Sequence, residues 1–152
     1  MLLGIDGLLD GDILKVLRDM GHGDELAVVD TNYPAYSTAR TSVVDQPLKI
    51  VGASAARVIK AVLSVMPLDT FVPQAAWRME VVGQPDEWPD VQHEVQKEID
   101  LALGKSTPMH GIERYEFYRR AAQCYAVLVT GETRAYGCFL LKKGVVMAGQ
   151  PA

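Results

Sequence analysis

One short apolar run constrains the fold of this chain more than any other feature. Leu26-Ala-Val-Val29 contains no polar residue, follows Met20-Gly-His-Gly-Asp-Glu25, and precedes Asp30 and a turn at Pro34. A continuous apolar run of this kind is typical of a parallel strand that is covered on both faces. We therefore predict a buried strand, with Asp30 at its carboxyl end, where open α/β sheets place their ligand crevices.

Other segments of the chain alternate between helical and extended patterns. Apolar residues at helical spacing, with suitable capping residues and glycine or proline stops, predict helices at Asp12–Met20, Ser54–Met66, Asp90–Leu103 and Glu113–Gln123. Further strands are predicted at Ser42–Asp45, Lys49–Val51, Ala75–Val82, Tyr125–Val129 and Cys138–Leu141. Thr31–Arg40 and Gly83–Pro89 are predicted as loops.

This alternation indicates the fold class. Strands that alternate with helices predict one α/β domain over residues 1–152, with a three-layer α/β/α arrangement and a mostly parallel central sheet. The last two strands are close enough in sequence to form a hairpin, which would make the sheet mixed. We expect residues 145–152 to be a flexible tail.

Composition and charge exclude several functional classes. The net charge of −4 argues against a general binder of nucleic acid or anionic membranes, and 49% apolar residues describe an ordinary globular protein. No apolar run approaches the roughly 20 residues of a membrane-spanning helix, and the first residues lack the basic start of a signal peptide. Cys124 and Cys138 show no metal-ligand spacing and are typical of free thiols in the cytoplasm. No strand precedes a phosphate-binding glycine motif, so we expect no nucleotide cofactor.

Several motifs, in the same order along the chain, resemble one known family. The stretch Met20–Ala35, together with Ile112–Tyr118, Val129–Gly137 and Leu140–Gly144, resembles the L-fucose mutarotase and D-ribose pyranase family over nearly the whole chain. The resemblance implies a cytoplasmic isomerase that interconverts the anomers of a free aldose without metal or cofactor. Arg114 favours the fucose branch, because the ribose branch typically carries a different residue there.

The resemblance also implies which residues form the site. Mutarotation requires one group to take a proton from the anomeric hydroxyl while another protonates the ring oxygen. The implied proton donor is His22: histidine is the residue type best suited to acid–base work near neutral pH, and two flanking glycines give this loop conformational freedom. The implied sugar-binding residues are Asp30, Arg114, Tyr136 and Gly137, with Tyr118 as a further match.

At one position the sequence departs from the family pattern. The family has asparagine after Tyr-Gly, whereas this chain has Cys138. A thiol is a weak donor and a weak acceptor, whereas an amide is strong as both. Cys138 therefore stays a candidate sugar-binding position through its backbone, and the natural sugar need not be fucose.

The spacing of His22 and Asp30 raises a geometric question. If the chain between them is extended, the two residues lie roughly 20 Å or more apart, which is far longer than one sugar. Either the Gly-His-Gly loop folds back over the sheet, or the residues serve different parts of a site shared between neighbouring chains. We favour an active site at a subunit interface of a ring-like homo-oligomer, and the resemblance implies a decamer of two stacked pentamers.

Three other functions remain open. The first is a D-ribose pyranase, which performs the same chemistry on another sugar. The second is a non-catalytic monosaccharide-binding module, which the change at Cys138 permits. The third is a metal hydrolase that uses His22, Asp24, His93 and His110, and it is disfavoured because these residues have no recognised ligand spacing.

Overall fold

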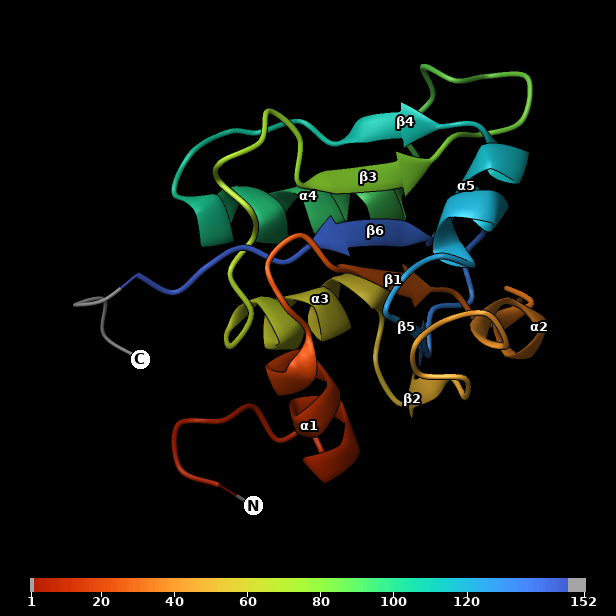
Figure 1. Cartoon of the computed structure of the whole chain (residues 1–152). Coiled ribbons are helices and arrows are strands. Elements are labelled where there is room, and N and C mark those ends of the chain that lie inside the picture. Colours follow the sequence, from red (N-terminus) through yellow and green to blue (C-terminus); the bar gives the residue numbers. More distant parts are fainter. Residues whose placement is uncertain (1, 148–152) are drawn as a thin grey trace.

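A six-stranded mixed sheet forms the middle layer of the structure, a computed structural model that describes residues 2–147 (Figure 1). The strands are β1 Glu25–Val29, β2 Leu48–Ile50, β3 Ala76–Met79, β4 His110–Ile112, β5 Ala126–Thr130 and β6 Phe139–Lys142. They lie side by side in the order β2-β5-β1-β6-β3-β4. The helices are α1 Gly11–Asp19, α2 Ala35–Ala39, α3 Ala55–Leu63, α4 Asp90–Leu103 and α5 Arg114–Ala121.

The central strand β1 lies beside β6, which runs antiparallel to the other described strands. It pairs in parallel with β5 on one side and antiparallel with β6 on the other. The sheet is therefore mixed, as expected, but the predicted hairpin of the last two strands is wrong, since β1 lies between them. The connection from β5 to β6 crosses the carboxyl end of β1, where the Thr31 amide donates to the Glu132 carbonyl at 2.9 Å.

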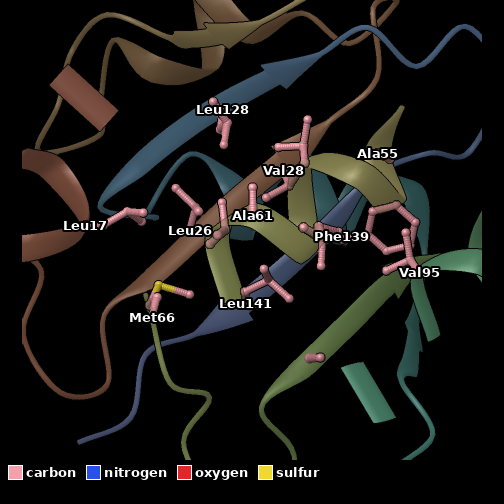
Figure 2. Close-up of a cluster of buried hydrophobic side chains, with 14 of the residues drawn as sticks. Leu17, Leu26, Val28, Ala55, Ala61, Met66, Val95, Leu128, Phe139 and Leu141 are labelled. Carbon is pink, nitrogen blue, oxygen red and sulfur yellow. The ribbon is translucent and has the colours of Figure 1, made fainter. Parts of the chain in front are cut away.

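Side chains of β1 alternate between two apolar clusters, which explains its continuous apolar run. Leu26 and Val28 enter the cluster formed with α1, α3 and α4, and Figure 2 shows them among Phe139, Leu141 and Ala61. Ala27 and Val29 enter the opposite cluster, which is covered by α2 and α5. This arrangement confirms the predicted three-layer α/β/α fold.

All four predicted helices are present, and local contacts explain their ends. The Asp10 side chain accepts a hydrogen bond from the Ile13 amide at the start of α1, and Ser54 does the same for Arg57 at the start of α3. Helix α4 ends at Gly104, whose φ of 66° places it in the left-handed region that favours glycine. No helix in the described part of the chain is long and apolar enough to span a bilayer.

Several predicted segments require correction. Residues Ser42–Asp45 form a bent segment and no strand, because the Ser42 amide donates to the Ala39 carbonyl at the end of α2 and the Val44 amide donates to the Tyr125 carbonyl. The predicted loop Thr31–Arg40 contains the short helix α2, and its start after Pro34 is compatible with the fixed φ of proline. Strand β4 was not predicted, because three residues that include Gly111 carry no usable periodicity. Residues 145–147 form no helix or strand, and the rest of the predicted tail lies outside the described residues.

A leucine pair tests the importance of the cluster between β1 and α3. Leu141 is 0% exposed, whereas Leu101 on α4 is 73% exposed. Leu141→Ala leaves a cavity and is expected to lower the free energy of unfolding by about 2–5 kcal/mol. Leu101→Ala, the matched control, is expected to change it by less than about 0.5 kcal/mol. Urea unfolding at one fixed protein concentration measures both, and equal effects would contradict this description of the core.

Candidate active site

A cavity of about 270 Å³ lies at the carboxyl end of β1 and brings together most of the predicted sugar-binding residues. Asp30 follows β1, Arg114 and Tyr118 come from α5, and Tyr136 and Cys138 come from the segment that crosses above β1. The cavity is lined by Asp30, Asn32, Tyr33, Met79, Arg114, Tyr118, Ala135, Tyr136 and Cys138. Three separate elements thus meet at the position that the sequence indicated.

The buried carboxylate of Asp30 is held on both of its oxygens. Its Oδ1 accepts from the Asn32 amide at 3.0 Å, and its Oδ2 accepts from the Cys138 thiol at 3.3 Å. Burial raises the pKa of the Cys138 thiol well above its ordinary value, so the thiol stays protonated and donates. The Cys138 side chain is buried, and its thiol is engaged by the hydrogen bond to Asp30. It therefore offers no strong hydrogen-bonding group to a ligand.

Arg114 and Tyr118 supply polar groups on the opposite wall. The Arg114 guanidinium donates to the Tyr115 hydroxyl at 2.8 Å, and this bond raises the pKa of Arg114. The Nε atom of Arg114 is buried and has no partner among the described residues. An unpaired buried donor of this kind costs about 1–3 kcal/mol. Burial raises the pKa of Tyr118, which keeps its phenol neutral.

Tyr136 and Gly137 lie in a tightly constrained part of the crossing segment, residues 131–138, which connects β5 to β6 above β1. Tyr136 has a φ of 62°, which costs a non-glycine residue about 1–2 kcal/mol and persists only where neighbouring contacts hold it. A Cβ atom on Gly137 would lie 2.7 Å from Cγ of Glu132 and 3.5 Å from Cβ of Asp30. Gly137 does not line the cavity, so its contribution is the space that lets this segment approach Asp30.

Glu132 holds in place the segment that crosses above β1. Its buried carboxylate accepts from Arg134 Nε at 2.8 Å, from the Arg134 amide at 3.0 Å and from the Ala55 amide at 3.3 Å. These bonds, above all those from the Arg134 side chain, lower the pKa of Glu132 to about 2. The Gly-Glu-Thr-Arg sequence gave no signal for this role, because the helix start at Ala55 lies far away in the chain.

His22 lies at the other end of β1 and pairs with a second residue that the sequence did not indicate. Its Nε2 is 3.0 Å from Oδ2 of Asp69; the His22 side chain is 47% exposed and that of Asp69 2%. The Phe71 ring packs edge-on against the imidazole. The buried Asp69 carboxyl group thus occupies Nε2 of the imidazole. Asp69 and the Phe71 ring together fix the orientation of the imidazole.

The two parts of the predicted site do not meet within one chain. His22 lines another cavity, of about 630 Å³, which shares no lining residue with the Asp30 cavity. The Gly23 amide donates to the Lys143 carbonyl and the Lys143 amide donates to the Asp24 carbonyl, so the Gly-His-Gly loop continues beside β6. The loop therefore does not fold back over the sheet, which removes the first of the two geometric alternatives.

The residues of the metal-hydrolase alternative are not assembled. Within residues 2–147, no group of three or more histidine, cysteine, aspartate or glutamate residues is placed to hold a metal ion. His22 faces Asp69 and Phe71, whereas His93 is exposed on α4 and stacks on Trp88. The geometry therefore gives no support to a site built from His22, Asp24, His93 and His110.

The low pKa of Glu132 predicts a specific loss of stability in acid. A depressed pKa stabilises the fold fully above the ordinary value of 4.5, and this stabilisation is lost as the pH falls toward about 2. We expect Glu132→Gln to remove a contribution on the order of 3 kcal/mol at neutral pH and to flatten stability across that range. The matched control is Glu94→Gln, since the exposed Glu94 binds the same arginine. Urea unfolding between pH 2 and pH 7 measures both, and equal pH dependence in wild type and Glu132→Gln would contradict the assignment.

Comparison with known proteins identifies the family of this chain. Residues 3–146 match the RbsD / FucU transport protein family. The chain is 37% identical to the fucose mutarotase of Homo sapiens, with 95% of this chain and 94% of the relative covered. It is similar to a crystal structure of protein Atu2016, with 56% identity, 97% of each chain covered and a TM-score of 0.94. It is also similar to the Streptococcus pneumoniae fucose mutarotase in complex with L-fucose, with 32% identity, coverage of 96% and 100%, and a TM-score of 0.84. The chain belongs to the RbsD / FucU transport protein family.

Proposed function

We propose that this protein is a cytoplasmic mutarotase that interconverts the α and β anomers of a free aldose, with L-fucose as the principal substrate. The observation that carries the proposal is the cavity in which Asp30, Arg114, Tyr118 and Tyr136 converge. The relatives named fucose mutarotase support the substrate, as does the family's complex with L-fucose. The chemistry is general acid–base catalysis and requires no redox or covalent step.

The residues of the cavity match the hydroxyl groups of a sugar. Asp30 accepts hydrogen bonds from hydroxyl groups, and the Arg114 guanidinium donates to a sugar oxygen. The Tyr118 and Tyr136 rings offer flat apolar faces to the carbon side of the sugar. His22, oriented by Asp69, transfers the proton during ring opening and closure.

A site that uses both groups requires a neighbouring subunit. Exposed apolar side chains flank both halves: Phe71 and Val72 near His22, and Val82 and Tyr115 near the Asp30 cavity. These are two different surfaces, so their pairing is heterologous, and a heterologous contact that closes generates a ring. The proposed assembly is a homo-oligomeric ring, a pentamer stacked into a decamer, with each site shared between neighbours. A monomer in light scattering at micromolar concentration would contradict it.

D-ribose is the second candidate substrate, and Cys138 is the observation that favours it. Its thiol is buried and bonded to Asp30, so this wall lacks the strong amide of the family pattern. Sites that hydrogen-bond a substrate hydroxyl discriminate strongly against analogues that lack it, and this chain has one such group fewer. Anomer exchange of L-fucose and D-ribose, compared by NMR exchange spectroscopy, decides between them. Binding of a sugar without faster exchange would instead indicate a non-catalytic binding module.

Removal of the His22 imidazole tests the catalytic assignment. His22→Ala is expected to lower the rate of anomer exchange at least about a hundredfold, because one acid–base group is lost. His93→Ala is the matched control, since His93 is exposed on α4 and outside both cavities, and its rate is expected to equal that of wild type. Exchange spectroscopy on L-fucose at fixed enzyme concentration measures all three proteins. Retained activity in His22→Ala would remove His22 from the mechanism.

Mixed oligomers test whether the site is shared. His22→Ala and Arg114→Ala each damage a different half, so neither variant alone is expected to be active. In rings assembled at random from equal amounts of both, about a quarter of the shared sites receive two intact halves. Co-expressed, differently tagged variants purified through both tags are therefore expected to recover a substantial fraction of wild-type exchange. Mixed oligomers as inactive as their parents would show that each site lies within one chain.

A further inference from the structure

A single buried amide lies behind the proposed sugar cavity. Gln92 lies on α4, which packs on the sheet face opposite to α5, and its side chain is 0% exposed. Its Nε2 donates to the Met79 carbonyl at 2.8 Å and to the Tyr136 carbonyl at 3.1 Å. Met79 and Tyr136 both line the cavity, although Gln92 itself does not. One NH₂ group therefore connects two walls of the cavity from behind.

Arg78 fixes the direction of this amide. The buried Arg78 guanidinium donates from Nη1 to Oε1 of Gln92 at 3.3 Å and from Nη2 to the Pro85 carbonyl at 2.7 Å. Its Cζ lies 4.3 Å from the centre of the Trp88 ring. A guanidinium has donors only, so the Gln92 oxygen must face Arg78 and its NH₂ group must face the two carbonyls. The amide cannot turn over without losing all three hydrogen bonds.

The contact with Tyr136 is made where the backbone most requires support. Tyr136 holds a φ of 62°, and among residues 2–147 it is the only non-glycine residue with positive φ. A residue in this region persists only when several contacts determine its conformation. The Gln92 bond fixes the Tyr136 carbonyl, and the Val82 amide binds the Tyr136 hydroxyl at 3.3 Å. The first contact fixes the backbone from which the ring projects, and the second holds the hydroxyl end of the ring.

We infer that Gln92 is a positioning residue of the sugar site, which holds the Tyr136 ring against the bound monosaccharide by donating to the carbonyls of Met79 and Tyr136. The inference rests on the proposed function, because it assigns the effect of Gln92 to sugar binding. The Gln92 side chain donates only to backbone carbonyls of the cavity wall and, among the described residues, forms no hydrogen bond with His22 or Asp69. Gln92 therefore acts on the affinity for the sugar and leaves the proton-transfer step unchanged.

Two substitutions remove the donor in different ways. Gln92→Glu keeps an oxygen for Arg78 but loses the NH₂ group, and Gln92→Met keeps the length of the side chain without polar atoms. Both are expected to raise KM for L-fucose about tenfold and to change kcat less than about twofold. This pattern is expected because the ground state and the transition state lose the same amount of binding energy. Anomer exchange at increasing sugar concentration, with thermal unfolding of each protein, provides the measurement.

Gln96 offers a matched control one helical turn away. It also lies on α4 and also holds a loop, by donating to the Thr107 carbonyl at 2.9 Å and accepting from the Met109 amide at 2.8 Å. Neither loop residue lines the Asp30 cavity. Gln96→Met is therefore expected to lower the melting temperature without a change in KM. A merely structural role of Gln92 would give the same pattern in Gln92→Met.

A double variant shows whether Gln92 acts through the tyrosine ring. In a Tyr136→Ala background there is no ring to position, so the addition of Gln92→Met is expected to raise KM less than about twofold further. Additive effects on KM, unchanged KM in both Gln92 variants, or failure of both to fold while Gln96→Met folds would overturn the inference. Wild-type protein that neither binds L-fucose nor accelerates its exchange would overturn the proposed function instead, so the two failures are distinguishable.

Discussion

The hydrogen bonds that tie the end of β1 to the segment after β5 determine the shape of this molecule. The Thr31 amide and hydroxyl both donate to the Glu132 carbonyl, and the Thr130 hydroxyl donates to the Val29 carbonyl inside the core. These bonds carry the chain across β1, and for this reason β5 and β6 flank it instead of pairing with each other. The same crossing places Tyr136 and Cys138 above Asp30. The hydrogen bonds at this crossing thus account both for the strand order and for the position of Tyr136 and Cys138 beside Asp30.

The two buried carboxylates near this crossing have opposite electrostatic surroundings. Glu132 forms an ion pair with Arg134 and accepts hydrogen bonds from two backbone amides, so the acceptor positions of its carboxylate are occupied by protein groups. Asp30 receives one amide and one weak thiol donor and, within residues 2–147, forms no salt bridge. An ionised carboxylate has about four acceptor positions, so Asp30 retains capacity for a ligand. Because the Arg114 guanidinium also lines the cavity, the cavity presents both acceptors and donors to a hydroxyl group.

The sequence predicts what local periodicity controls and fails where distant contacts decide. The bounds of α4 follow from its apolar spacing and Gly104, and β1 follows from its apolar run. Asp30, Arg114, Tyr118, Tyr136 and Cys138 were predicted together through motif resemblance, and the fold gathers them. Asp69, Glu132 and Gln92 could not be predicted, because their partners lie 47, 77 and 44 positions away in the chain. The residues next to each of these three side chains in the sequence do not indicate which distant group the side chain will bind.

Strand β1 keeps His22, at one of its ends, apart from the Asp30 cavity at the other end. Both of its neighbours hold it through backbone ladders, and its side chains pack in both cores, so no loop motion can bring its ends together. A ligand the size of one monosaccharide reaches only one end. If both ends act on one sugar, the missing half must come from another copy, and every subunit of a closed ring then gives one half to each neighbour. Catalysis in such a ring depends on assembly even when each chain is fully folded, which makes the subunit contact part of the active site.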